Sequence, residues 1–139
     1  MGMAPQDIYD FHQWFNQLFT PRLGKRAGTM YQALLLAIAR NAQTYVETGT
    51  ARENGNWVGD GQSTIVFGAF AQRYRTHLWT CDLSPAAIES SQRATNGLHS
   101  NITFKTGDSI EFLRDFDRPI DFLYLDSFDF NLAPGADPN

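Results

Sequence analysis

The sequence of 139 residues contains a single cysteine, Cys81, and no long apolar run, and each shortage excludes a class of protein. One cysteine cannot form an intrachain disulfide or a cysteine-based zinc site. No apolar run approaches the ~20 residues that span a bilayer, so we expect no membrane partner. Residues 1–6 (MGMAPQ) lack the basic-then-apolar pattern of a signal peptide and the Ser or Thr of a myristoylation motif. The sequence therefore predicts a soluble, cytoplasmic protein.

Basic residues are also too few for a general nucleic-acid or anionic-membrane surface. Lys and Arg number 11 against 15 Asp and Glu, which gives a formal net charge of −4, so we expect no nucleic-acid partner. Hydrophobic residues make up 42% and aromatic residues 14% of the chain, which is typical of a folded protein. At this length the chain is expected to form one domain with a substantial core.

The first 43 residues predict a helical segment that packs on the rest of the chain. Apolar residues at helical spacing predict one helix over residues 7–19 and another from Thr29, as its N-cap, to about Asn41. The basic segment between them, residues 21–28 (PRLGKRAG), is interpreted as a turn-rich linker with solvated charges. Residues 132–139 predict a loose tail.

From residue 44 to residue 131 the chain alternates strands and helices, which predicts an α/β core with a Rossmann-like parallel sheet. Helix signals are clear at Ser84-Pro85 and Asn96-Gly97, and Asp108 fits an N-cap. The last predicted strand, residues 121–125 (DFLYL), is apolar enough to be buried on both faces. Predicted strands cover about 44–47, 77–81, 102–105 and 121–125, and predicted helices cover about 63–74, 85–96 and 110–116.

Residues 44–64 combine a strand, glycines and a helix start. Gly49 and Thr50 form a turn after the strand, and Ser63 opens the following apolar helix. Glycines permit close approach to the backbone, and a helix N-terminus presents free amides. The stretch therefore predicts a site for a nucleotide-like ligand. Residues 51–62 are interpreted either as a lid with Trp57 or as a surface excursion.

Four acidic residues follow the predicted strands, where parallel α/β sheets bind ligands. Asp82, after the second strand, can accept hydrogen bonds from both hydroxyls of a ribose. The alternative, a helix-capping or solvated turn acid, is less favoured because Ser84 already supplies the cap. Asp108 can cap its own helix, accept a hydrogen bond from an adenine amino group, or do both. Glu47 is expected either to anchor the loop or to face a positively charged ligand group.

Asp126 is the fourth of these acids. With Ser127 and Asp129 it could hold a substrate, act as a base or bind a hard metal ion. Two nearby carboxylates are too few to predict a metal site, since hard cations take about six or more oxygen ligands.

The chain resembles the class I S-adenosylmethionine-dependent methyltransferases, and most closely a small-molecule or sugar O-methyltransferase-like branch. The resemblance spans about residues 29–131 and rests on four motifs in order: VETGT (46–50), CDLSP (81–85), TGDS (106–109) and DFLYLDS (121–127). It implies S-adenosyl-L-methionine as cofactor, a small-molecule methyl acceptor and the strand order 3-2-1-4.

The resemblance also implies roles for individual residues. Glu47 and Gly49 would lie near the methionine moiety, Asp82 would hold the ribose, and Asp126 would be the catalytic residue near the methyl group. The predicted cofactor-binding set is Glu47, Gly49, Thr50, Ser63, Asp82, Leu83, Gly107, Asp108 and Ser109. Transfer from a sulfonium needs alignment of donor and acceptor, and a base where the acceptor is a hydroxyl.

Two departures from that family stand out. About ten residues separate the first glycine motif from its helix, and the chain ends soon after the fourth strand, as though truncated. In the order 3-2-1-4 the strand 121–125 is an exposed edge, which favours association. We therefore expect a fragment of a longer chain, or an edge covered by the N-terminal helices or by another subunit in a homo-oligomer.

Two other functions are weighed. An NAD-dependent oxidoreductase also places an acid after its second strand, but no G-x-G-x-x-G follows the first strand and no Tyr-x-x-x-Lys pair is evident. A non-catalytic binding or assembly module with a methyltransferase-like fold is the alternative from a different class. Cofactor binding separates the oxidoreductase from the other two, and turnover separates the enzyme from the module.

Overall fold

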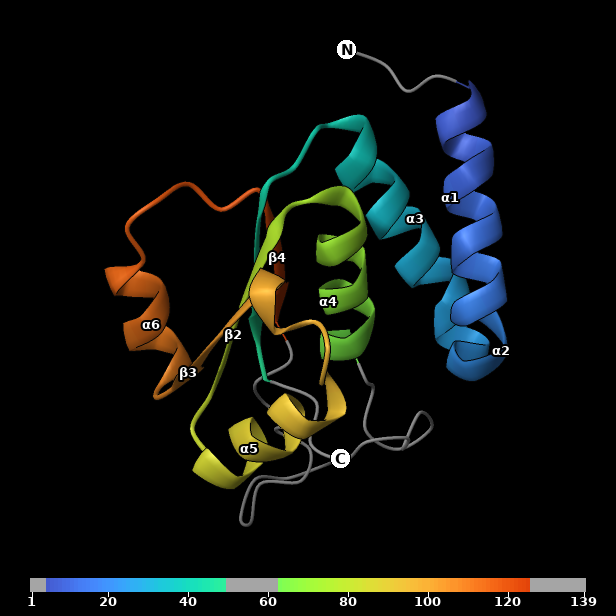
Figure 1. The fold of residues 1–139 in the computed structure, drawn as a ribbon. Coiled ribbons are helices and arrows are strands. Elements are labelled where there is room, and N and C mark those ends of the chain that lie inside the picture. The colour runs from blue at the N-terminus through green and yellow to red at the C-terminus, as the bar shows by residue number, and fades with distance from the viewer. Residues whose placement is uncertain (1–4, 50–62, 126–139) are drawn as a thin grey trace, which may run out of the picture.

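The computed structural model describes residues 5–49 and 63–125, which fold around a parallel β-sheet (Figure 1). The strands lie in the order β3-β2-β1-β4, which confirms the predicted fold class and strand order. Their bounds are β1 Thr44–Thr48, β2 His77–Asp82, β3 Ile102–Thr106 and β4 Phe122–Leu125. In the register, Glu47 lies opposite Thr80, and Asp82 lies opposite Thr106.

Helices cover both faces of this sheet. Figure 1 shows α4 on one face with α3 and α1 outside it, and α6 on the other face. The helices are α1 Pro5–Leu18, α2 Thr20–Leu23, α3 Ala27–Ala39, α4 Ser63–Tyr74, α5 Pro85–Ala94 and α6 Ser109–Asp115, with 3₁₀ turns η1 Gly24–Arg26 and η2 His99–Asn101. In the part of the chain that the structure describes, no helix has the length and apolar character needed to cross a membrane.

After residue 80, the helices begin at the capping residues that the sequence predicted. The Ser84 hydroxyl accepts a hydrogen bond from the Ala87 amide (3.1 Å), so it caps α5 as predicted. The helix gives way to a turn in which Gly97 has φ 96°, a left-handed conformation that glycine adopts without strain. The carboxylate of Asp108 caps α6 in the same way.

The prediction of a turn-rich linker over residues 21–28 is wrong. The chain there forms α2 and η1, and α3 already begins at Ala27, so that Thr29 lies inside the helix and is not its N-cap. The reason is burial, because the side chains of Leu23 and Ala27 are only 4% and 7% exposed. Helical turns place both residues in the core, and Gly24 changes the chain direction with a φ of 58°.

Strand β4 is not buried on both faces as its apolar sequence predicted. Phe122 and Tyr124 pack on Phe67 of α4, with ring centroids 5.3 and 5.1 Å apart, but Leu123 and Leu125 are 45% and 66% exposed. Among the described strands β4 pairs with β1 alone. The strand therefore alternates between a packed and an exposed face, as an edge strand does when one face is uncovered.

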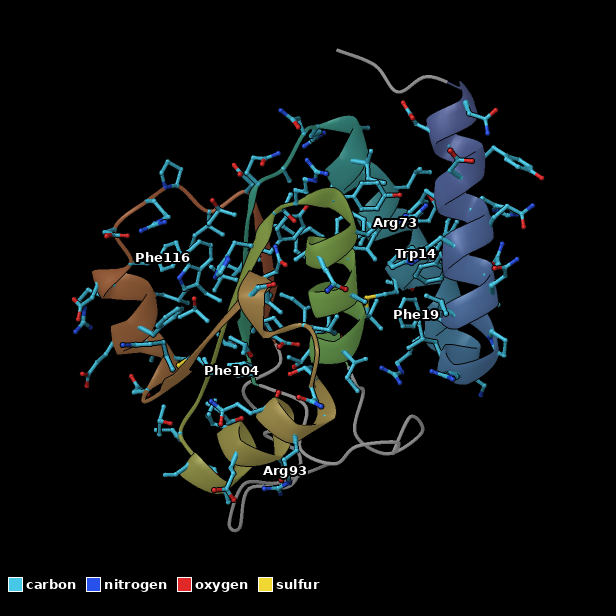
Figure 2. The ribbon with its side chains drawn as sticks, in the orientation of Figure 1. Trp14, Phe19, Arg73, Arg93, Phe104 and Phe116 are labelled. Carbon is cyan, nitrogen blue, oxygen red and sulfur yellow. The ribbon has the colours of Figure 1, made fainter. Side chains whose placement is uncertain are left out.

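The core lies between α1, α3, α4 and the sheet and is rich in aromatic rings. Phe11 and Phe15 of α1 and Phe70 of α4 are fully buried, and the rings of Phe11 and Phe70 meet edge to face at 6.1 Å. Figure 2 shows Trp14 beside Arg73, whose guanidinium lies 5.4 Å from the Trp14 ring centroid. The N-terminal helices are thus attached to the sheet through α4.

Candidate functional site

The carboxyl ends of β1, β2 and β3 are tied together by two backbone hydrogen bonds. The Gly49 amide donates to the Cys81 carbonyl (2.7 Å), and the Gly107 amide donates to the Asp82 carbonyl (2.8 Å). Gly49 has φ 90°, where a Cβ would be strained. These bonds bring Gly49, Asp82 and Gly107, all predicted site residues, to one edge of the sheet.

Asp82 is the last residue of β2 and is 7% exposed. Its Oδ1 accepts a hydrogen bond from the Ser84 amide (2.9 Å), which fixes the carboxylate at the sheet edge. Ser84 supplies the helix cap, yet Asp82 also stabilises the turn before α5. The capping and ligand-holding interpretations of Asp82 are therefore compatible. Leu83, the next residue, is 66% exposed and presents an apolar surface beside this carboxylate.

Asp108 follows β3 and has a defined structural role. Its Oδ2 accepts a hydrogen bond from the Glu111 amide (3.1 Å), so Asp108 is the N-cap of α6, with Ser109 as the first residue of the helix. This is one of the two roles that the sequence allowed for Asp108. A capping carboxylate can accept further hydrogen bonds through its remaining lone pairs.

Glu47 lies at the centre of a buried cluster of hydroxyl groups. Its side chain is 0% exposed, and Oε2 accepts a hydrogen bond from the Ser63 hydroxyl. Oε1 accepts hydrogen bonds from the hydroxyls of Thr64 (2.5 Å) and Thr80 (2.8 Å). These donors offset the cost of burying the carboxylate. The structure therefore brings Glu47 and Ser63 together, in agreement with an anchoring role for Glu47.

Thr64 and Thr80 were not among the predicted site residues. Thr64 could have been proposed from its place beside Ser63 at the start of α4. Thr80 carries no such signal, because its relation to Glu47 comes from the register between β1 and β2. That register depends on the paired strands and cannot be read from the residues around Thr80.

A groove of about 500 Å³ lies beside this edge, between α6 and the sheet. It shares Gly107 and Asp108 with the predicted site and extends away from it toward Trp79 and Phe116, the latter labelled in Figure 2. Neither Asp82 nor Glu47 lines it. The groove is therefore next to the predicted site and does not coincide with it.

Cys81 is among the residues that line this groove, and its side chain is buried. Its Sγ donates to the Gly107 carbonyl (3.3 Å). Burial raises the pKa of the Cys81 thiol, and the nearby carboxylates of Asp82 and Asp108 raise it further. Since the thiolate is the reactive form, the burial and raised pKa of the thiol favour a packing role for Cys81.

Part of the predicted site lies outside the described residues. Thr50 and Asp126 are in this part, as are Trp57 and the rest of the 51–62 stretch. In the described ranges, no group of three or more His, Cys, Asp or Glu side chains is arranged to hold a metal ion.

Comparison with known protein families identifies one that matches this chain. The sequence pattern of a methyltransferase domain family matches residues 57–129 of this chain. No curated protein sequence matches it closely enough to count as a relative.

Two solved structures share the fold. An SAH-bound methyltransferase from Podospora anserina matches with a TM-score of 0.58 and 16% identity, over 89% of this chain and 51% of that one. An O-methyltransferase from Bacillus cereus in complex with SAH (S-adenosylhomocysteine) matches with a TM-score of 0.54 and 18% identity, over 93% of this chain and 57% of that one. The present chain thus spans little more than half the length of either structure.

Proposed function

Because the chain belongs to the methyltransferase domain family, we propose that it binds S-adenosylmethionine at the carboxyl edge of its sheet and serves methyl transfer. The acceptor we propose is a hydroxyl of a small molecule or sugar. This choice is supported by the motif resemblance and by the Bacillus cereus O-methyltransferase among the similar structures.

The observation that carries the proposal is the position of Asp82. Its carboxylate ends β2, is held by the Ser84 amide, and lies between Gly49 and Gly107 in the tied strand ends. A carboxylate in this place can accept hydrogen bonds from the two hydroxyls of a ribose. Each such bond to a charged group contributes about 1.5–3 kcal/mol, so Asp82 alone can affect cofactor affinity strongly.

The surrounding residues fit an adenosyl group. Leu83 offers an exposed apolar side chain for the adenine ring. Asp108 and Ser109 stand at the start of α6, where the carboxylate can accept a hydrogen bond from the adenine amino group and a backbone amide can donate one to a ring nitrogen. Gly49 leaves room for the backbone to approach the ligand closely. When bound, the cofactor supplies an electrophilic methyl group on a sulfonium.

Asp126 is proposed as the catalytic residue near that methyl group, and Thr50 as a further cofactor contact. Both assignments rest on the motif resemblance alone, since the two residues lie outside the described part of the chain. A carboxylate near the transferring methyl group can orient an acceptor hydroxyl and take its proton.

Calorimetry with S-adenosylmethionine, SAH and NAD tests the proposal. Wild type is expected to bind the two adenosyl sulfur compounds and not NAD. Asp82→Ala is expected to lose at least about 10- to 100-fold in affinity for them, which is the range for one of the two charge-assisted hydrogen bonds.

Asp82→Asn separates the two roles of Asp82. Asparagine keeps an acceptor oxygen for the Ser84 amide, so thermal stability should stay near wild type. It has no second acceptor oxygen and no charge for the ribose hydroxyls, so affinity should still fall about tenfold. Asp117→Ala, an exposed aspartate with a contact to the adjacent Arg118, is the control and should bind normally. Binding of NAD alone, or unchanged SAH affinity in Asp82→Ala, would contradict the proposal.

We further propose that β4 associates with a second copy of the chain and that the protein acts in the cytoplasm. The first is supported by the edge position of β4 and the exposure of Leu123 and Leu125. The second is supported by the sequence features alone. A reporter-tagged full chain, followed by cell fractionation, tests the location.

A further inference from the structure

The hydroxyl cluster around Glu47 joins three parts of the fold. Glu47 comes from β1, Ser63 and Thr64 form the start of α4, and Thr80 comes from β2. The side chains of Glu47, Thr64 and Thr80 are each 0% exposed. The cluster is therefore an internal joint between the sheet and the first turn of α4.

Thr80 is the member that connects this joint to the second strand. It lies opposite Glu47 in the parallel register, and its hydroxyl donates to the same Oε1 atom that accepts from Thr64. The carboxylate is thus held from the sheet side by Thr80 and from the helix side by Thr64. Each donor restricts the orientation of the carboxylate that the start of α4 also contacts, so we expect loss of the sheet-side donor to loosen this contact.

The position of the α4 start matters at the sheet edge. The first amides of a helix have no partner within the helix and face outward from its N-terminus. Ser63 begins α4, and Glu47 lies two residues before Gly49 at the edge. A shift of the joint would move the first turn of α4 relative to the edge where Asp82 lies.

We propose that Thr80 is a positioning residue, which orients the Glu47 carboxylate and through it holds the first turn of α4 beside the cofactor site. Thr80 does not touch the cofactor, because its side chain is fully buried and its hydroxyl is directed to Glu47. The link to the cofactor rests on the function proposed above. The link between Thr80 and α4 rests on the hydrogen bonds alone.

Three variants separate this role from packing. Thr80→Val keeps the shape of the side chain and removes the hydroxyl, whereas Thr80→Ser keeps the hydroxyl and removes a methyl group. Thr76→Val is the matched control, since Thr76 is also buried (6% exposed) and precedes β2 at the opposite end of the strand. All three are compared with the wild-type chain.

Amide hydrogen exchange measures how firmly the first turns of α4 are held. The amides of Phe67 and Gly68 lie one turn after Ser63 and Thr64, whose carbonyls are their partners in the regular α-helical pattern. Thr80→Val is expected to speed their exchange about tenfold relative to amides in the middle of α3, because loss of one hydrogen bond to a charged group favours local opening. Thr80→Ser and Thr76→Val should leave that ratio unchanged.

Calorimetry with SAH measures the consequence at the site. Thr80→Val is expected to weaken binding about tenfold, and Thr80→Ser should restore it to within about twofold of wild type. Equal loss in Thr80→Val and Thr80→Ser would assign the effect to packing and overturn the proposal. Unchanged exchange at Phe67 and Gly68 in Thr80→Val would overturn it as well.

Failure of the proposed function gives a different result. If wild type does not bind SAH, the function is contradicted, while the exchange ratio still decides whether Thr80 holds α4. If Thr80→Val does not fold, Glu47→Gln tests the joint through which Thr80 acts, because a carboxamide has one acceptor oxygen and so loses one of the hydrogen bonds that the carboxylate accepts in the cluster. Faster exchange at Phe67 and Gly68 in Glu47→Gln supports the joint, and unchanged exchange overturns it.

Discussion

At the residue scale, Gly68 of α4 lies against the side chain of Ile102 in β3, a contact that the sequence did not predict. A Cβ built at Gly68 would lie 2.6 Å from Cδ1 of Ile102, which is too short for a carbon–carbon contact. Ile102 is itself 5% exposed and packed in the core. A side chain at position 68 would therefore require either Ile102 or the helix to shift within a packed core.

Gly68→Ala is expected to destabilise the protein by about 1–2 kcal/mol, since overpacking outweighs the better helix propensity of alanine. Urea unfolding measures the change. Gly28→Ala in α3, where a Cβ would meet nothing within 4 Å, should instead stabilise by about 0.5–1 kcal/mol.

The contact with Ile102 can be tested separately. Ile102→Val removes the Cδ1 atom, so Gly68→Ala should cost less in that background than in wild type. Equal costs in the two backgrounds would show that the Ile102 contact is not the cause.

At the element scale, an aspartate holds the amino-terminal ends of β1 and β4 together. Asp121 Oδ2 accepts hydrogen bonds from the amides of Gln43 (2.9 Å) and Thr44 (3.0 Å), and the Asp121 amide donates to the Thr44 carbonyl (3.0 Å). These bonds close the amino-terminal end of the pair. They set the register in which Phe122 lies opposite Tyr45.

Asp121→Ala is expected to lower the free energy of unfolding by about 1–2 kcal/mol, because two amides lose a charged acceptor and must turn to water. Asp121→Asn keeps one acceptor oxygen and should fall between alanine and wild type. Chemical denaturation measures both. The exposed Asp117→Ala variant is the control, and a loss in it as large as in Asp121→Ala would contradict the specific role of Asp121.

At the scale of the whole molecule, the described sheet ends at a strand with an uncovered face. Leu123 and Leu125 of β4 point away from α4 and are 45% and 66% exposed, while Phe122 and Tyr124 pack against α4. An apolar edge strand is a template for pairing with another chain. The proposed self-association through β4 follows from this arrangement.

Leu125→Lys is expected to reduce self-association, because a charge on an edge strand disfavours pairing with a second copy. The side chain is 66% exposed, so thermal stability should change little. Size-exclusion chromatography with light scattering gives the mass of each species. Leu36→Lys, at a residue of α3 that is 51% exposed, is the control. A wild-type chain that is monomeric throughout would contradict association through β4.

Much of the fold was predictable because its signals are local. Alternating strands and helices predicted the α/β class, and short motifs predicted the starts of α5 and α6 at Ser84 and Asp108. The segment from Pro21 to Gly28 was misjudged because its helical conformation depends on burying Leu23 and Ala27 in a core formed by distant residues. The burial of β4 was misjudged for the same reason, since it depends on what covers each face of the sheet.

The sequence by itself determined the order of the four strands and of the helices between them, the family resemblance and the acids that follow the strands. Caps, glycines and strand ends can be recognised from consecutive residues. Tertiary structure alone decided that Glu47 is a buried joint to α4 and that Thr80 takes part in it. Thr80 and Glu47 are 33 residues apart in the chain and meet only because β1 and β2 pair in one register. A register is a property of two strands together, so neither strand reveals it alone.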